Sequence, residues 1–152
     1  MAKPLSGKPA YYFTFWGRFL DRVHREHPDW TSQKAQPRYY VSMPSPIPRT
    51  AIGASFTGDG RLRHDLYING GDREQSLEVF KALEEQRLAL EGAYGHSLVF
   101  ETKLARSLKA CRIAEYREGD VTETESHAAL VEWLLDRGVR LRKALIQIGI
   151  PA

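Results

Sequence analysis

The chain has 152 residues, of which 42% are hydrophobic and 27% charged, as in a soluble globular protein of one domain. This composition excludes a disordered chain and a collagen-like fibre. No apolar run approaches the roughly 18 residues that span a bilayer, and no apolar segment of a secretory signal precedes Tyr11. The single cysteine, Cys111, excludes an internal disulfide and a cysteine zinc ribbon. We therefore expect a cytoplasmic protein without a membrane partner.

Basic residues gather in the first part of the chain. Up to Ile68 there are ten Lys and Arg against five Asp and Glu, a balance of +5, whereas the remainder carries twelve against fourteen, a balance of −2. A basic region with aromatic neighbours is compatible with nucleic-acid binding. The overall net charge of +3 is small, and arginines scattered over an ordinary surface would also produce it.

The first predicted helix covers residues 11–27 and follows a flexible N-terminal tail at residues 1–10. Its apolar residues recur at helical spacing. Pro28 ends it, because the residue before a proline disfavours the α conformation. Arg18, Arg22 and Arg25 form a stripe on another face. The aromatic run at residues 11–16 has more apolar surface than one helix face buries, as in a protein–protein adaptor or oligomerisation domain.

Three strands are expected next, at residues 39–43, 50–56 and 61–68. The sequence Thr57-Gly58-Asp59-Gly60 suits a hairpin turn between the last two. A long helix is expected over residues 72–94, with Asp72 as its N-cap and Gly95 after its end.

Two further strands, at residues 97–104 and 110–117, precede a last helix at residues 123–148. Thr122 and Glu125 would begin that helix as a capping box. The order α-βββ-α-ββ-α predicts a single α+β domain over residues 11–148, in which the helices pack on a mostly antiparallel five-stranded sheet.

Several short motifs follow one another in a set order. They are Phe15-Trp16-x-x-Phe19-Leu20, Asp65-Leu66-Tyr67-Ile68, Phe80-x-x-Leu83, Arg87-x-x-Leu90-Glu91, Gly95-x-x-Leu98, Ala110-x-Arg112-Ile113, Tyr116-Arg117-x-Gly119-Asp120 and Trp133-Leu134. In this order and spacing, residues 11–147 resemble a bacterial and archaeal family called Domain of Unknown Function 4268.

The resemblance implies a context and no mechanism. Members of that family often form the C-terminal domain of a longer protein whose N-terminal part resembles a PD-(D/E)XK restriction endonuclease. We therefore expect a non-enzymatic accessory domain of a bacterial nuclease or phage-defence system of restriction type. Its expected partners are DNA, or a protein such as a nuclease subunit or another defence protein.

A small metal-dependent nuclease is the alternative. In such enzymes an Asp and a Glu-x-Lys pair on neighbouring strands hold Mg²⁺ and activate water. Asp65, Glu101 and Lys103 offer these residue types, but Glu-x-Lys would lie on the fourth strand instead of the third. The other interpretation is a solvated strand face, in which case no cofactor is expected. His24 and His27 have no third ligand at a predictable position, so no metal site is assigned.

The nucleic-acid interpretation depends on arginines that contact phosphates and tyrosines that stack on bases. The candidates are Arg18, Arg22, Arg25, Lys34, Arg38, Tyr39, Tyr40, Arg61 and Arg63. In the competing interpretation the arginines only solvate the surface, and one of the two tyrosines belongs to the core.

A second group of charged residues carries either a structural clamp or a ligand site. Arg87 and Glu91 are four residues apart on a predicted helix and can form a side-chain pair. Arg112 on the fifth strand can be an inward charge bonded to Glu91 or Glu115. Cys111 is expected to be a small buried hydrophobe rather than a nucleophile.

Overall fold

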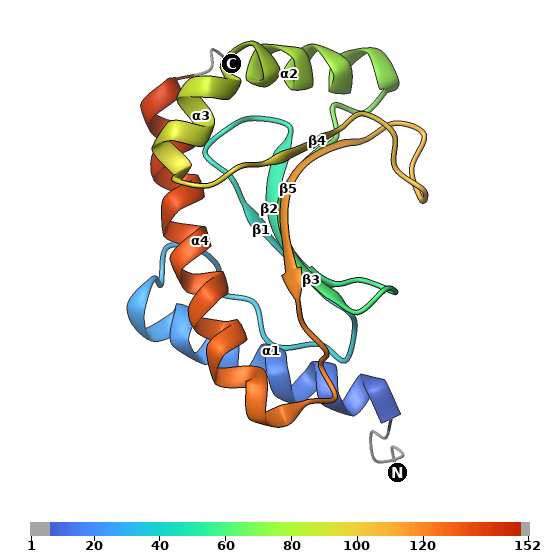
Figure 1. Cartoon of the computed structure of the whole chain (residues 1–152), viewed down its shortest axis with the longest axis vertical. Coiled ribbons are helices and arrows are strands. Elements are labelled where there is room, and N and C mark those ends of the chain that lie inside the picture. The colour runs from blue at the N-terminus through green and yellow to red at the C-terminus, as the bar shows by residue number, and fades with distance from the viewer. Residues whose placement is uncertain (1–6, 150–152) are drawn as a thin grey trace.

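The computed structural model describes residues 7–149 and confirms the α+β single-domain architecture with the order α-βββ-α-ββ-α (Figure 1). No helix in this range is long and apolar enough to cross a membrane. The elements are α1 (Gly7–Glu26), β1 (Tyr40–Pro44), β2 (Thr50–Phe56), β3 (Arg61–Ile68), α2 (Arg73–Glu85), α3 (Arg87–Tyr94), β4 (Val99–Glu101), β5 (Cys111–Glu118), the short 3₁₀ helix η1 (Thr124–Ser126) and α4 (His127–Ile148).

The five strands form one antiparallel sheet in the order β1-β2-β3-β5-β4. Because side chains alternate between the two faces of a strand, the register assigns each residue to a face. Ile52, Leu66 and Ile113 lie side by side on β2, β3 and β5 and are fully buried. The intervening residues face the opposite side, which we call the open face.

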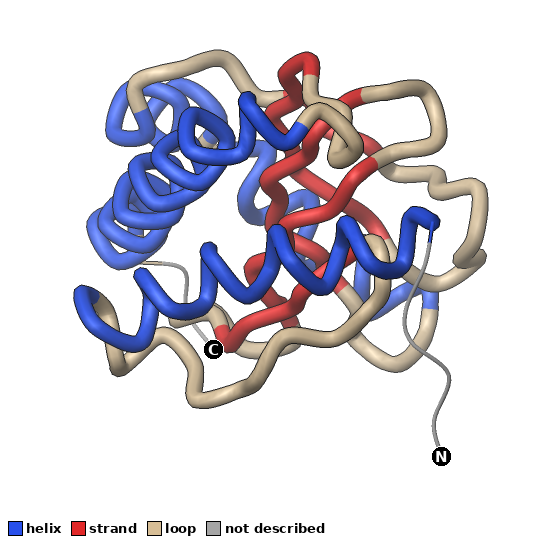
Figure 2. Tube along the Cα trace, turned by 90° about the horizontal axis from the view of Figure 1, so that it is seen from below, coloured by secondary structure: helices blue, strands red, loops and turns tan. Residues whose placement is uncertain are grey.

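The helices cover the apolar face of the sheet. In Figure 1, α4 runs along the left of the strands, α2 and α3 lie above and α1 below. Figure 2, seen from below, shows α1 crossing the lower end of the sheet. One core cluster joins α1 and the start of α4 to the sheet around Phe15, Trp16 and Leu134. A second joins α2, α3 and the end of α4 to the sheet around Phe80 and Leu145.

The long helix predicted over residues 72–94 is divided in two. Asp72 caps α2, as expected, by accepting a hydrogen bond from the backbone N–H of Gln75 (2.8 Å). The helix then ends at Gln86, and α3 begins directly after it. This break lets α2 pack on β3 and β5 while α3 packs on α4, so two apolar faces find different partners.

Three other boundaries differ from the expectation. α1 begins at Gly7, so residues 7–10 are helical rather than tail. Pro9 is compatible with this start, because N–H groups of the first turn have no intrahelical partner; residues 1–6 lie outside the described range. The fourth strand is only Val99–Glu101, and the chain then projects from the sheet over residues 102–110. η1 precedes α4, and the N–H of Thr122 bonds to Asp120 instead of forming the predicted box.

Candidate functional site

Polar side chains occupy the open face of the sheet. Alternation along the paired strands brings them together there, opposite the face that the helices cover. They are Ser55 on β2, Arg63, Asp65 and Tyr67 on β3, Glu101 on β4, and Arg112 and Tyr116 on β5. Because the other face of the sheet is packed against helices, this polar face is a candidate binding surface.

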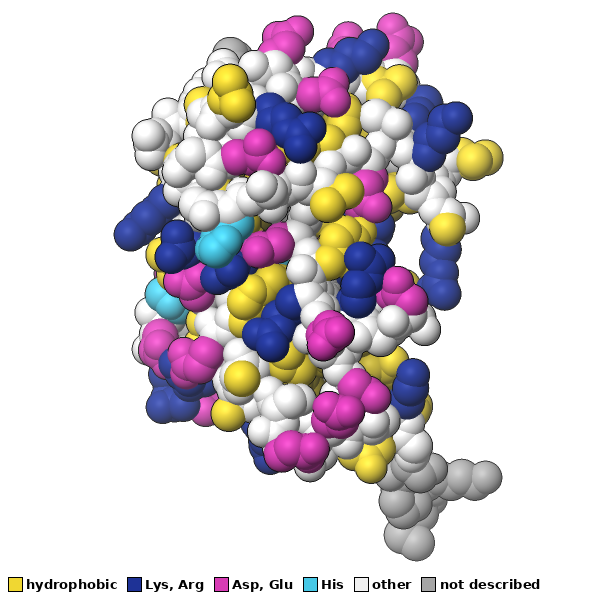
Figure 3. All heavy atoms as spheres, in the orientation of Figure 1, with side chains coloured by type: hydrophobic (Ala, Val, Ile, Leu, Met, Phe, Trp, Pro, Cys, Tyr) yellow, Lys and Arg dark blue, Asp and Glu magenta, His cyan; other side chains and the backbone are white. Residues whose placement is uncertain are grey.

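The open face is hollowed. A cavity of about 640 Å³, which we call the sheet hollow, lies over strands β1, β2 and β3 and is bordered by the start of α1 and by the projecting residues 104–107. Figure 3 shows dark-blue basic side chains bordering the opening on the right of the molecule. The charged side chains of its lining are four basic and one acidic: Lys8, Arg63, Arg106, Arg112 and Asp65.

Asp65 lies at the floor of the sheet hollow. It is only 5% exposed, and its Oδ2 accepts a hydrogen bond from Nε of Arg112 (2.8 Å). Burial raises the pKa of the Asp65 carboxyl above its usual value, against the opposing effect of Arg112 and Arg63. Gly53, the partner of Asp65 on β2, makes room for the carboxylate, because a Cβ at this position would collide with Oδ1.

Beside the pair of Asp65 and Arg112, Tyr116 contacts the other charged side chains of the open face. Its hydroxyl donates to Oε2 of Glu101 (2.8 Å), and burial, followed by Glu101, raises the pKa of the phenol. The guanidinium of Arg61 stacks on its ring at 4.1 Å, and that of Arg63 lies 6.0 Å from the ring centre. Nε of Arg63 is buried without a hydrogen-bond partner in the described structure.

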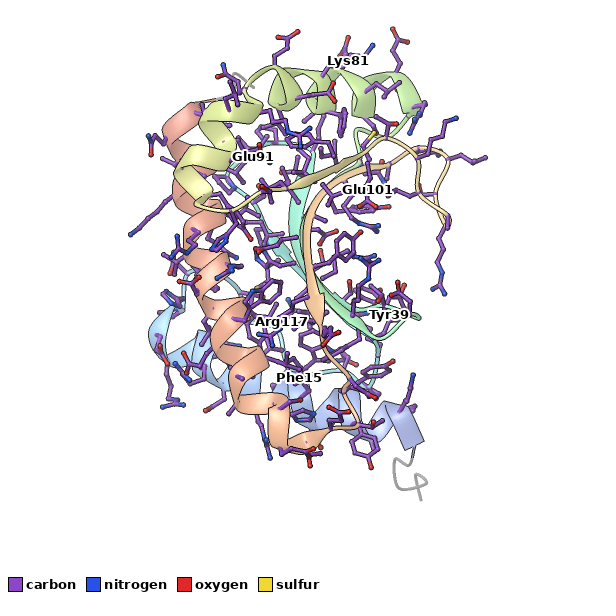
Figure 4. The ribbon with its side chains drawn as sticks, in the orientation of Figure 1. Phe15, Tyr39, Lys81, Glu91, Glu101 and Arg117 are labelled. Carbon is purple, nitrogen blue, oxygen red and sulfur yellow. The ribbon has the colours of Figure 1, made fainter. Side chains whose placement is uncertain are left out.

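Two tyrosines form one wall of the sheet hollow. The rings of Tyr39 and Tyr40 lie 4.9 Å apart in a tilted arrangement. Arg106, from the projecting segment, donates to the Tyr39 hydroxyl (3.2 Å) and lies over its ring, so it connects the two sides of the opening. Arg38 stacks on Tyr40 at 4.4 Å. Figure 4 shows Tyr39 and Glu101 on the same side of the sheet, away from α4.

Residues 11–148 match the family described as Domain of unknown function (DUF4268). The chain belongs to this family. No curated protein and no solved structure matches it. Among the motif residues on which the resemblance was based, Asp65, Tyr67 and Arg112 line the sheet hollow of this DUF4268 domain.

The residues predicted to bind nucleic acid separate into two groups. Tyr39, Tyr40 and Arg63 line the sheet hollow, and Arg38 and Arg61 stack beside it. The stripe on α1 is elsewhere: Arg18 is exposed, Arg22 pairs with Glu26 and Glu132, and Arg25 pairs with Asp21 at 2.8 Å. Lys34 is exposed on the connection between α1 and β1. The structure therefore brings only part of the predicted set together.

The nuclease alternative has two of its three residues on the open face. Asp65 and Glu101 share that face, but Arg112 bonds to the first carboxylate and Tyr116 to the second. Lys103 is exposed on the projecting segment and does not line the sheet hollow. Within residues 7–149, no three His, Cys, Asp or Glu side chains are grouped as metal ligands.

The predicted pair of Arg87 and Glu91 exists (3.3 Å) and holds the start of the fourth strand. Oε2 of Glu91 accepts from the N–H of Leu98 (2.7 Å), and Nη2 of Arg87 donates to the Leu98 carbonyl (3.3 Å). We call these three residues the Leu98 clamp. The Leu98 N–H, and then Arg87, lower the pKa of Glu91.

The prediction that Arg112 bonds to Glu91 or Glu115 was wrong. Arg112 bonds to Asp65, because strand alternation places it on the open face, whereas Glu115 on the other face accepts from Tyr94 (2.6 Å) and Arg137 (2.9 Å). Cys111 is buried, as predicted, and burial raises the pKa of its thiol.

Sequence reasoning missed the contributions of Lys8, Gly53 and Arg106 to the site. Lys8 falls in the predicted tail, and Arg106 falls between the two strands predicted at residues 97–104 and 110–117, the first of which is shorter in the structure. Arg63, Asp65 and Tyr67 are spaced two apart on β3, as are Arg112 and Tyr116 with Ala114 between them on β5. This alternation is the signal that indicates a polar sheet face.

Proposed function

We propose that this domain is a non-enzymatic accessory domain that binds nucleic acid through the sheet hollow, within a bacterial nuclease or phage-defence system of restriction type. The observation that supports it best is the lining of the sheet hollow, in which four basic side chains and one acidic side chain lie beside four tyrosines, Tyr12, Tyr39, Tyr40 and Tyr67.

The two kinds of side chain suit the two parts of a nucleotide. Guanidinium and ammonium groups contact phosphates, and such contacts are independent of sequence. Tyrosine rings stack on unpaired bases, at roughly 1–3 kcal/mol per base. Arg63 has a buried Nε without a partner in the described structure, so a ligand oxygen would satisfy a donor that the fold leaves unused.

The nuclease and defence part of the proposal depends on the family context. A domain that holds nucleic acid without cutting it would position a substrate for a nuclease partner. The ion pairs of α1 favour the sheet hollow over the arginine stripe, since Arg22 and Arg25 already have carboxylate partners.

Two triple variants of the full chain test the choice of face. The first changes Lys8, Arg63 and Arg106 to Gln; the second, with the same loss of charge, changes Arg18, Arg25 and Lys34 to Gln. Fluorescence anisotropy with a labelled single strand is measured over a salt series. Each phosphate contact contributes about 0.7 to the slope of log K against log salt on single strands, so the first variant should flatten the slope by about 2 and the second should leave it unchanged. Absence of wild-type binding at low salt would refute the proposal, as would equal effects of both variants.

The nuclease alternative is tested on the same protein. We expect no cleavage of single- or double-stranded DNA above background with Mg²⁺ or Mn²⁺. Cleavage that both Glu101→Gln and Lys103→Ala abolish would establish the enzyme instead.

A further inference from the structure

The floor of the sheet hollow differs chemically from its rim. If nucleic acid binds in the sheet hollow, as proposed above, this difference decides which part of a nucleotide reaches the floor. Lys8 and Arg106 come from α1 and from the projecting segment, at the edges of the lining, whereas Asp65 belongs to the central strand β3 and is 5% exposed. A buried carboxylate repels a phosphate, so the floor favours a different part of a nucleotide.

Asp65 and Arg112 together present an acceptor next to donors. Oδ2 of Asp65 accepts the hydrogen bond from Nε of Arg112 (2.8 Å). Oδ1 occupies the space left by the missing side chain of Gly53, and both residues belong to the lining of the sheet hollow. Arg112 has further N–H groups on its guanidinium. An acceptor beside donors is complementary to a base edge that carries an amine next to a ring acceptor.

The sheet hollow is large enough to admit a nucleobase, and its walls offer surfaces for stacking. Its volume of about 640 Å³ is within the range of sites for small ligands, and Tyr39, Tyr40 and Arg106 supply flat surfaces on which a ring can stack. Bases inside a duplex are paired and stacked, so only an unpaired base can bring its edge to the floor.

We infer that the sheet hollow receives one unpaired nucleobase that carries an exocyclic amine, and that Asp65 accepts a hydrogen bond from this amine. Cytosine, adenine and guanine carry such an amine. Thymine and uracil have no such amine, and their only free ring N–H is flanked on both sides by carbonyl oxygens. A carboxylate that accepts from this N–H therefore also lies close to a carbonyl oxygen, whose repulsion weakens the contact. Asp65 is therefore the residue that determines base preference, whereas Lys8, Arg63 and Arg106 contribute to affinity.

The test compares 15-nucleotide dC and dT strands at pH 7.5 and constant salt. We expect the wild type to bind the dC strand about tenfold more tightly, in the range of one good base contact. In Asp65→Asn the amide oxygen accepts the Arg112 bond and the amide NH₂ faces the base, so the preference should fall below twofold or reverse toward dT. The matched control is Asp136→Asn, which alters a carboxylate paired to Arg140 (2.8 Å) on α4 and should keep the preference.

A modified strand tests the same contact without changing the protein. Two methyl groups on the cytosine N4 remove both hydrogens that Asp65 would accept, so this strand should bind wild type no better than dT. Salt-dependent binding with equal affinity for dC and dT would overturn the base preference and leave the proposed function standing. Absence of binding to any strand would overturn both.

Discussion

Gly53 faces Asp65 directly across β2 and β3, and the carboxylate of Asp65 occupies the space that a side chain at position 53 would need. A glycine in the interior of a strand weakens it and commonly marks a close approach. Here the carboxylate of Asp65 approaches the backbone of Gly53 closely. The glycine therefore lowers the stability of β2 at the position where it makes room for this carboxylate.

Gly53→Ala should destabilise the protein. The new Cβ collides with Oδ1 of Asp65, and overpacking of this kind costs about 1–3 kcal/mol. Urea denaturation at pH 7 measures the change in the free energy of unfolding. Gly58→Ala is the control, because a Cβ there has no atom within 4 Å. Combining Gly53→Ala with Asp65→Ala should recover part of the loss; additive losses would contradict the proposed collision.

Substitutions of Arg112 and of Asp65 should lower the free energy of unfolding by different amounts. Arg112→Met leaves a buried carboxylate without its partner, which costs about 3–5 kcal/mol. Asp65→Asn should cost less than Arg112→Met, because the amide oxygen can still accept the hydrogen bond from Nε of Arg112, whose guanidinium is more exposed than the carboxylate. The double variant should be more stable than Arg112→Met alone. If both single variants lost the same free energy of unfolding, the interaction between Asp65 and Arg112, rather than the unpaired carboxylate, would account for the loss.

The fold was predictable from sequence because its apolar pattern is regular. Helical spacing on α1 predicts Trp16, Phe19 and Leu20 as core residues, and they are buried, although Phe13, which the same spacing includes, is 46% exposed. On β3, Leu62, Leu66 and Ile68 alternate with polar residues and are buried. The break at Gln86 was not predictable, since residues on both sides of it favour a helix. It accompanies a difference in packing, since α3 packs mainly on α4 while α2 packs on β3 and β5.

The site was predictable only in part. Tyr40 and Arg63, selected by residue type, line the sheet hollow. Charge counting also selected Arg22 and Arg25, which pair with Glu26 and Asp21 four residues away on the same helix. The further pair of Arg22 with Glu132 depends on the packing of α1 on α4. The role of Gly53 requires the strand register, and that of Arg106 requires the projecting segment to return to Tyr39. Both are long-range relationships that local sequence does not contain.

His64 should make the protein sensitive to acid. It is 3% exposed, its Nε2 has no partner in the described structure, and burial, followed by Arg142 and Arg137, lowers its pKa from 6.5 to about 3. Between these values the unfolded chain binds a proton that the folded protein does not, so stability falls as the pH decreases through this window. One pH unit corresponds to about 1.4 kcal/mol, so the loss at pH 4.5 should be about 2–3 kcal/mol.

His64→Leu should remove this part of the pH dependence. The free energy of unfolding, measured in urea between pH 7.5 and 4.5, should decrease less in the variant than in the wild type. His24→Gln changes an exposed histidine on α1 and should follow the wild-type curve. A His64→Leu curve parallel to that of the wild type would mean that folding does not lower the pKa of His64.

The Leu98 clamp should contribute to stability through Glu91. A hydrogen bond from a backbone N–H to a charged group contributes about 1.5–3 kcal/mol, and Glu91 receives one from Leu98 while it pairs with Arg87. Glu91→Ala should therefore lower the free energy of unfolding by about 1–3 kcal/mol at pH 7. Glu84→Ala, an exposed position on α2, should change it by less than about 0.5 kcal/mol.

The pH dependence of that difference identifies the charged form as the stabilising one. Because the Leu98 N–H and Arg87 lower the pKa of Glu91 below 4.5, its contribution is complete above that pH and is lost as the pH falls through the lowered value. The gap between wild type and Glu91→Ala should accordingly narrow in acid, whereas Glu91→Gln, which keeps an acceptor oxygen and no charge, should lie between the two at pH 7. A gap that stays constant from pH 7 to pH 3 would assign the effect to packing of the Glu91 side chain instead of its carboxylate.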